Sequence, residues 1–240
     1  MGARLSRLLL IVISLFLLEL SNLGNAQAKT FSTMLCQLPE YTCYIAKRGD
    51  SWQSLFKAAS EFIMSINRIN THIHPGMKIA IPKKVNLDEV SSIDKMDFAP
   101  LPIKIEAPGQ RFIYVSLKST ILAWGAYDED GNLLNWGPIS GGQDWCSDIG
   151  RPCHTKTGTF TIYEKEGPGC VSTKFPVGRG GAPMPYCMYF NGGFALHGSY
   201  EVPGYNASHG CVRMFIDDAK WLNREFLGSE VRVPVVITNK

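Results

Sequence analysis

The chain has 240 residues, of which 45% are hydrophobic, enough to form one large core and a smaller second one. It carries 24 Lys and Arg against 21 Asp and Glu, a formal net charge of +3 at pH 7. The basic residues form no block or stripe in the sequence, which argues against a nucleic-acid-binding protein.

The first 28 residues have the pattern of a secretory signal peptide. Arg4 and Arg7 give a positive start, an almost unbroken apolar run extends from Leu8 to Leu18, and an A-x-A pattern ends at Ala28. The apolar run is shorter than the ~20 residues of a membrane span. We therefore expect cleavage after Ala28, export to the periplasm and no stable membrane insertion afterwards. An uncleaved membrane anchor is the alternative.

Residues 43–83 are expected to form a small α+β domain in the order strand, helix, helix, strand. Residues 44–46 favour a strand, and Asp50 is predicted to begin a capped helix. Residues 62–69 repeat apolar side chains at helical spacing, and residues 78–82 alternate as the closing strand.

This segment resembles a LysM domain, a small glycan-binding module of cell-wall proteins. The resemblance is carried by residues 44–51, Asn70 and residues 73–82, whereas Trp52 and Ser60 stand where the family more often has an aliphatic residue and a glycine. It implies binding to the glycan strands of peptidoglycan. A spacer of the same fold with little glycan affinity is the alternative.

Residues 84–108, which contain Lys, Asp, Ser and Pro, are predicted to be a linker. Residues 109–238 predict a mainly β domain, a sandwich or barrel with one or two helices. The expected elements are strands at 112–117, 120–127, 133–140, 159–163, 188–190, 194–197 and 231–237, a turn at 128–132 and a helix at 217–227.

Seven cysteines in an exported chain leave one thiol unpaired. Among the possible connectivities we favour pairs of sequence neighbours, because each closes a compact loop. Cys211 is then the free thiol, and in an oxidising compartment an unpaired thiol is a candidate reactive group. The expected disulfides are Cys36–Cys43, Cys146–Cys153 and Cys170–Cys187.

Two segments, residues 194–199 and 207–214, carry the side chains best suited to nucleophilic catalysis. A thiol with a pKa of about 8.5 is mostly protonated at neutral pH, so Cys211 needs a nearby base. His197 lies on a separate expected strand and can approach the sulfur freely, whereas His209 is held by the local backbone. We therefore predict His197 as the base and expect His209 to shape the turn or the substrate groove.

Further residues around the thiol fit the same chemistry. Gly210 permits a tight turn that points backbone N–H groups at an oxyanion, and Arg213 can hold a substrate carboxylate. Two alternatives compete: His197 as a hydrogen-bonded core residue, or a zinc site of His197, His209 and Cys211. The His-x-Cys spacing is unusual for structural zinc and no fourth ligand stands nearby, so we expect no metal.

These residues resemble the active-site motif of the L,D-transpeptidase family, the YkuD-type catalytic domain. Supporting matches lie at 155–160 and 184–190, and the resemblance covers roughly residues 110–238. Only ten residues separate the two parts of the motif, fewer than is usual in the family. The matching residues are His197-Gly198 and Ser208-His209-Gly210-Cys211-Val212-Arg213.

The resemblance implies a cysteine acyltransferase that acts on peptidoglycan stem peptides. The thiol of Cys211 would attack the carbonyl of the third residue of a tetrapeptide stem, a meso-diaminopimelate, and the terminal D-alanine would leave. The thioester would pass to a second diaminopimelate, giving a 3–3 crosslink, or to a lysine of an anchored wall protein. Water as acceptor would make the enzyme an L,D-carboxypeptidase, and a non-catalytic wall-binding protein is the third possibility.

The resemblance also implies roles for the residues around Cys211. Gly198 would orient the ring of His197, and the N–H groups of Gly210 and Cys211 would stabilise the oxyanion. No metal or organic cofactor is implied, and acylation by carbapenems is expected. The remaining substrate-binding candidates are Ser208, His209, Arg213 and Tyr186.

Overall fold

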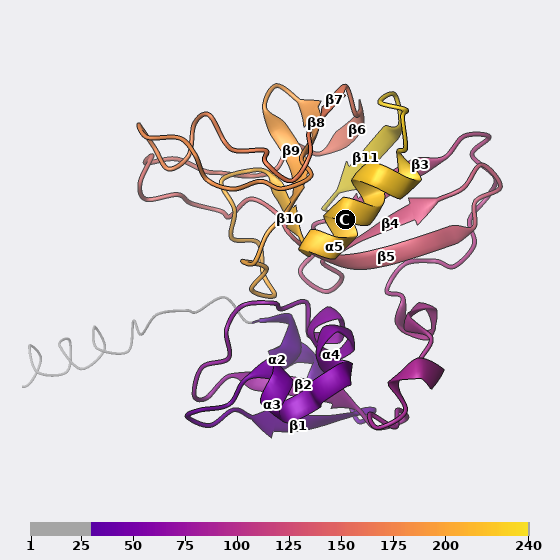
Figure 1. Cartoon of the computed structure of the whole chain (residues 1–240), viewed down its shortest axis with the longest axis vertical. Coiled ribbons are helices and arrows are strands. Elements are labelled where there is room, and N and C mark those ends of the chain that lie inside the picture. The colour runs from indigo at the N-terminus through magenta and orange to yellow at the C-terminus, as the bar shows by residue number, and fades with distance from the viewer. Residues whose placement is uncertain (1–29, 240) are drawn as a thin grey trace, which may run out of the picture.

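Two units follow one another along the chain, and the mainly β unit is stacked on the smaller N-terminal one (Figure 1). The structure is a computed structural model that describes residues 30–239. The expected signal peptide, residues 1–28, lies outside this range. Within it, no helix has the length and apolar character to cross a membrane.

The N-terminal unit has the predicted order of strand, helix, helix and strand. Its two strands pair antiparallel and its helices pack on them around a core that includes Ile63, Ile69 and Ile79. A short additional helix precedes the first strand. The elements are α2 (Phe31–Leu35), β1 (Tyr41–Ile45), α3 (Trp52–Phe56), the 3-10 turn η1 (Lys57–Ala59), α4 (Ser60–Asn67) and β2 (Lys78–Pro82).

The helix α3 is capped by Ser51, so the prediction that Asp50 begins it is wrong by one residue. The Ser51 hydroxyl accepts the N–H of Ser54 at 3.1 Å. The Asp50 carboxylate instead accepts the Lys47 N–H at 2.7 Å and the Tyr44 hydroxyl at 2.8 Å. Because these bonds close the preceding turn, the carboxylate is not available to the first turn of the helix.

The predicted linker packs against both units rather than crossing freely between them: Leu87 and Val90 pack on the core of the N-terminal unit. It contains the 3-10 turns η2 (Val90–Ser92) and η3 (Lys95–Phe98), and the side chain of Leu101 is buried in the core. The backbone carbonyl of Lys95 accepts the Trp136 indole N–H at 3.0 Å. A backbone carbonyl is present at every residue, so this contact could not be predicted from the polar composition of the segment.

The second unit is mainly β, as predicted, and its strands form one curled sheet (Figure 1). The sheet has nine strands in the order β6-β11-β3-β4-β5-β10-β9-β8-β7. The strands are β3 (Phe112–Ser116), β4 (Ala123–Tyr127), β5 (Leu133–Ser140), β6 (Gly158–Thr161), β7 (Glu164–Lys165), β8 (Met188–Asn191), β9 (Phe194–Gly198), β10 (Val212–Met214) and β11 (Pro234–Thr238).

Two elements differ locally from those expected. The strand β4 begins at Ala123 rather than at residue 120, because the N–H groups of Ile121 and Leu122 both donate to the Lys118 carbonyl and form a turn. The expected C-terminal helix is present as α5 (Ile216–Trp221), which continues as the π-helical turn η4 (Leu222–Phe226).

The three disulfides join the predicted cysteines: Cys36 to Cys43, Cys146 to Cys153 and Cys170 to Cys187. Cys211 is the free cysteine. It lies directly before β10, which pairs antiparallel with β5 and parallel with β9 in the middle of the sheet. The unpaired thiol therefore lies at the start of a strand that is paired on both sides.

Candidate active site

The strand pair β9–β10 brings Cys211, His197 and Arg213 together on one face of the sheet. In the parallel register Arg213 stands opposite His197. Alternate residues of a strand share a face, so Cys211 and Arg213 point the same way, as do Ala195 and His197. All three predicted functional side chains line one cavity of about 520 Å³.

The walls of this cavity come from loops on both sides of the strand pair, and its charged lining is mainly positive. Arg151, Lys174 and Arg213 line it together with a single acidic residue, Glu201. A concave site with this balance of charge favours a ligand that carries carboxylate groups.

His197 is 6% exposed, and its ring is oriented by its own strand. Nδ1 lies 2.9 Å from the carbonyl oxygen of Gly198. A carbonyl only accepts, so Nδ1 carries the hydrogen and Nε2 is the unprotonated nitrogen. Burial lowers the pKa of His197 to about 4, the Gly198 hydrogen bond opposes this shift, and the positive charge of Arg213 adds to it. The ring is thus a neutral imidazole that can accept a proton at pH 7.

The thiol of Cys211 is also uncharged at rest. Burial raises its pKa above the usual value, while the backbone N–H of Ala195 and the charge of Arg213 act in the opposite direction. The sulfur lies 3.8 Å from the carbonyl of Gly193, a contact in which the S–H donates. Cys211 and His197 are therefore both uncharged, and they line the same cavity.

The turn before β10 is fixed by Ser208 and requires glycine at position 210. The Ser208 hydroxyl accepts the Gly210 N–H at 3.0 Å and donates to the Cys211 carbonyl at 2.5 Å. Gly210 has φ +123°, and a Cβ there would stand 2.5 Å from the ring of Phe194. Because the Gly210 N–H is already bonded, the structure does not offer it as the free oxyanion donor that the sequence led us to expect.

Thr155 is a residue to which sequence reasoning gave no role, although it lies in a matching segment. Its buried hydroxyl donates to the Gly210 carbonyl at 2.7 Å and accepts the Gly142 N–H at 2.8 Å. The Gly210 carbonyl and the Cys211 N–H belong to one planar trans peptide and point in opposite directions. By holding that carbonyl, Thr155 fixes the direction of the Cys211 N–H.

His209 lines the cavity, but its ring is engaged elsewhere. Nε2 lies 2.8 Å from a carboxylate oxygen of Asp148, and the ring packs on Phe175 with centroids 4.5 Å apart. Asp148 belongs to the loop closed by the Cys146–Cys153 disulfide, and nothing in the sequence marks it as a partner of His209. This geometry fits the groove-shaping role expected for His209, which stays a prediction.

The other predicted residues divide between the cavity and the surrounding structure. Gly198 and Ser208 line the cavity, whereas the residues lining it do not include Tyr186. The ring of Tyr186 instead packs against the guanidinium of Arg224, 5.2 Å from the ring centroid. The structure therefore does not support Tyr186 as a substrate-binding residue.

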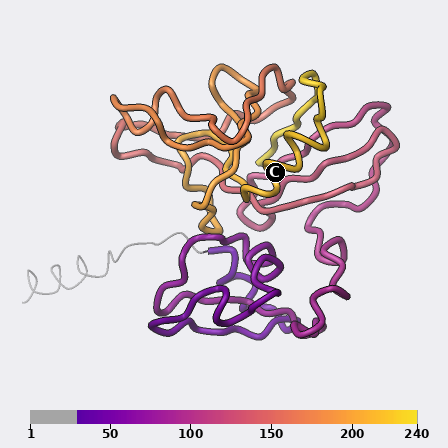
Figure 2. The backbone as a smooth tube through the Cα atoms, in the orientation of Figure 1, coloured from indigo at the N-terminus to yellow at the C-terminus, as the bar shows by residue number. Residues whose placement is uncertain are grey.

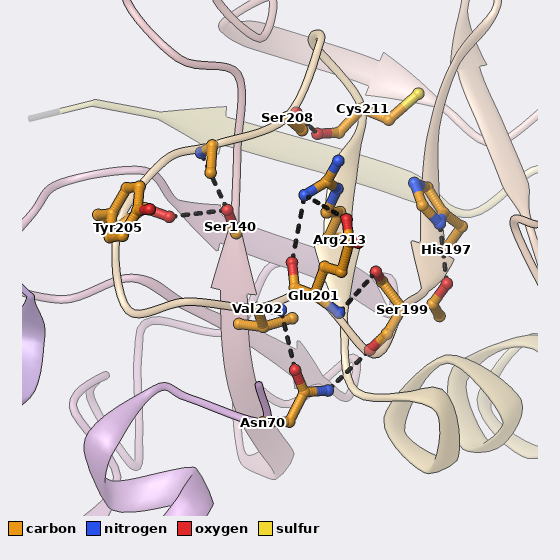
Figure 3. A network of polar contacts seen from close by, with 12 residues as sticks. Asn70, Ser140, His197, Ser199, Glu201, Val202, Tyr205, Ser208, Cys211 and Arg213 are labelled. Atoms are coloured by element: carbon orange, nitrogen blue, oxygen red, sulfur yellow. Dashed lines mark hydrogen bonds and ion pairs between the residues drawn. The ribbon is translucent and has the colours of Figure 1, made fainter. Parts of the chain in front are cut away.

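The side chain of Arg213 is held by the loop that connects β9 and β10 (Figure 3). One guanidinium nitrogen, Nη1, lies 3.3 Å from the Glu201 carbonyl oxygen and 3.4 Å from its carboxylate. Figure 3 shows this guanidinium between the strand that carries His197 and the turn that carries Ser208. Arg213 is thus a positioned cation that lines the same cavity as Cys211 and His197.

Residues 110–237 match the family model of the L,D-transpeptidase catalytic domain, YkuD, which is more than half of the chain. The matched residues include the whole strand pair and both loops that carry the motif, but not the N-terminal unit. A comparison with curated proteins found no match.

Several solved structures are similar to this chain. An L,D-transpeptidase from Xylanimonas cellulosilytica is 26% identical with a TM-score of 0.49, covering 57% of this chain and 65% of that one. A mutant Enterococcus faecium L,D-transpeptidase is 22% identical with a TM-score of 0.44, covering 54% and 50%. L,D-transpeptidase 3 from Mycobacterium tuberculosis, in complex with a faropenem-derived adduct, is 17% identical with a TM-score of 0.43, covering 54% and 60%. The matches span less than two thirds of these proteins.

Proposed function

The chain belongs to the L,D-transpeptidase catalytic-domain family, and from that premise we propose that it is a peptidoglycan L,D-transpeptidase with Cys211 as its nucleophile. The observation that carries the proposal is the free thiol of Cys211, which lines a cavity with the buried, neutral His197. A nucleophile and a base of matched protonation state are the minimum that acyl transfer requires.

In the first half-reaction a tetrapeptide stem is the donor. His197 Nε2 takes the thiol proton while the sulfur attacks the carbonyl of the third residue, a meso-diaminopimelate. The Cys211 N–H, whose direction Thr155 fixes, stabilises the tetrahedral oxyanion. His197 then returns the proton to the amine of D-alanine, which leaves, and a thioester with Cys211 remains.

In the second half-reaction an amine releases the acyl group. The acceptor is the side-chain amine of a second diaminopimelate, which gives a 3–3 crosslink, or a lysine of an anchored wall protein. His197 removes the proton from the attacking amine, and the thiol regains a proton as it leaves. Arg213 holds a substrate carboxylate, and Arg151 and Lys174 add positive charge to the same cavity. No step requires a cofactor.

The N-terminal unit is proposed to be a LysM-like domain that binds glycan strands. Its strand, helix, helix, strand order supports this assignment. A glycan-binding unit beside the catalytic domain would raise the local concentration of stem peptides on an insoluble polymer. Three disulfides support an oxidising compartment such as the periplasm, and the proposed signal peptide supplies the route to it.

The test is intact-mass analysis of the protein lacking residues 1–28 after incubation with tetrapeptide muropeptides. We expect a mass increase equal to the donor without D-alanine, located on Cys211, followed by crosslinked dimers. Tripeptide products without dimers would instead identify an L,D-carboxypeptidase. A chain that gains no mass and forms no product would be a non-catalytic wall-binding protein, and the proposal would be wrong.

Two histidine variants separate the base from its neighbour. His197→Ala should abolish acylation by a carbapenem at neutral pH, because no other group is proposed to take the thiol proton. His209→Ala should leave measurable acylation, because that ring is bound to Asp148. Equal losses in the two variants would show that the roles of the histidines are wrongly divided.

A further inference from the structure

The connection between β9 and β10 reaches out of the catalytic domain and contacts the N-terminal unit. Figure 2 shows this segment extending from the β domain to the N-terminal unit. The contact lies at residues 199–204, and its partners are Asn70, Ile69 and Phe31. Residues separated by more than a hundred positions therefore meet at the edge of the catalytic cavity.

Asn70 makes three hydrogen bonds to this segment, two of them from its side chain (Figure 3). Its Nδ2 donates to the Ser199 carbonyl at 2.7 Å, and its Oδ1 accepts the Val202 N–H at 2.8 Å. Its backbone N–H donates to the Val202 carbonyl at 3.0 Å. One side-chain amide therefore fixes both ends of the four-residue stretch from Ser199 to Val202.

The neighbours of Asn70 extend the same contact. Ile69 forms a β-bridge with Pro203, and the Phe31 N–H donates to the Gly204 carbonyl at 2.9 Å. Further along, the catalytic domain holds the segment itself, because the Ser140 hydroxyl donates to the Tyr205 carbonyl at 2.7 Å. The middle of the connection is thus held by the N-terminal unit and its end by the sheet.

The two residues between the ends that Asn70 fixes are Tyr200 and Glu201, and both line the catalytic cavity. Tyr200 is 80% exposed, so its side chain supplies little packing to hold this tip in place. Glu201 contacts Arg213 through its backbone carbonyl and its carboxylate. The position of the Arg213 guanidinium consequently depends on a backbone segment that Asn70 holds.

We propose that Asn70 is a positioning residue of the active site: by holding residues 199–202, it places Glu201 and thereby directs the Arg213 guanidinium toward the substrate carboxylate. The proposal rests on the function proposed above and adds to it that the N-terminal unit completes the substrate-binding wall. Without the Asn70 side chain, the Ser199 carbonyl and the Val202 N–H lose their partners, so the tip is held less firmly and a substrate must order it on binding. The cost falls on binding of the carboxylate and leaves the thiol and imidazole pair intact.

Asn70→Ala tests the proposal through a split between KM and kcat. Loss of ordering at Arg213 should raise KM for the donor stem about tenfold, the scale of one hydrogen bond, with kcat changed less than about twofold. Alkylation of Cys211 by iodoacetamide needs no carboxylate contact, so its rate and pH profile should stay unchanged. Asn86→Ala is the matched control, because the Asn86 amide is exposed and bonds only the nearby Asp88 N–H among the described contacts.

A double variant shows whether Asn70 acts through Arg213. In an Arg213→Ala background the guanidinium is gone, so adding Asn70→Ala should raise KM no further. An unchanged KM in Asn70→Ala, additive increases in the double variant, or a parallel fall in kcat and alkylation rate would each overturn the proposal. A chain that forms no thioester even without substitution contradicts the proposed function itself, and this inference with it.

Discussion

Burial of His197 and Cys211 shifts their pKa values in the directions that keep both side chains uncharged near neutral pH. Many reactive cysteines are instead held as thiolates by a neighbouring cation or a helix N-terminus. In the proposed mechanism the proton moves only when a substrate is attacked. The raised pKa keeps the free thiol protonated and protects it from adventitious oxidation, which follows thiolate character.

The pH dependence of acylation follows from the pKa of His197. Because this pKa is about 4 rather than 6.5, the ring stays a neutral base well below pH 6.5. The rate constant for acylation by a carbapenem should therefore be nearly constant between pH 6 and 8 and fall only at lower pH. Stopped-flow or intact-mass kinetics across this range measures it, and a half-maximal rate near pH 6.5 would contradict a buried base.

The same shift has a consequence for stability. Between pH 4 and 6.5 the unfolded chain binds a proton on His197 that the folded chain does not. The contribution of His197 to the free energy of unfolding is therefore complete above pH 6.5 and decreases as the pH falls toward 4. A His197→Gln variant should show less destabilisation in this interval than the unaltered protein.

At the scale of elements, the turn that precedes β10 decides where the sulfur and the oxyanion donor lie. Its conformation depends on Gly210, because a Cβ at this position would clash with the ring of Phe194. It also depends on Thr155, which lies 55 residues away in the chain. The strand β10 has three residues and owes its place to pairing with β5 and β9 on its two sides. Cys211 is therefore held by contacts made outside its own segment.

Thr155→Val tests the role of this turn. Valine has nearly the same shape but lacks the hydroxyl, so the Gly142 N–H and the Gly210 carbonyl lose their bonds and the Cys211 N–H is no longer held in direction. We expect kcat to fall about tenfold or more, less than the ~10²–10³ of a deleted oxyanion donor. Thr155→Ser keeps the hydroxyl and should retain most activity. Equal kinetics of the two variants would contradict this role.

At the scale of the whole molecule, the two units are joined by a buried arginine. The Arg68 guanidinium packs on the rings of Phe31 at 4.6 Å and Trp136 at 4.8 Å, and its Nε donates to the Ile121 carbonyl at 3.1 Å. Burial lowers the pKa of Arg68. Its contacts reach both units, so it fixes the orientation in which Asn70 meets the connection between β9 and β10.

Arg68→Ala should lower the free energy of unfolding by about 2–4 kcal/mol, because it removes packing and leaves the Ile121 carbonyl without this donor. Arg48→Ala is the matched control: its side chain is exposed in the same unit, and its effect should stay within about 0.5 kcal/mol. Chemical denaturation followed by fluorescence measures both. A loss no larger than that of the control would show that the units are not joined through Arg68.

The sequence by itself determined much of the chemistry of this protein. An odd number of cysteines singled out Cys211, and the local pairing of the other six is confirmed. The motif around the thiol predicts His197 as its base, because a thiol requires a base and few residue types supply one, and the structure places both residues in one cavity. Alternating and helical apolar patterns also predicted most strands and the order of the N-terminal unit, since each repeat reports which face of an element is buried.

Only the tertiary structure decided what surrounds these residues. Strands of two or three residues, such as β7 and β10, are too short to show a periodic pattern and form because neighbouring strands offer hydrogen bonds. Thr155 and Asn70 stand in segments that carry the family resemblances, but nothing in the sequence shows what they or Asp148 contact. The roles of Thr155, Asp148 and Asn70 come from partners 55, 61 and 132 positions away. Reactive side chains can be recognised in a sequence by their residue type. The residues that position them are distant in the sequence and come into contact only when the chain folds.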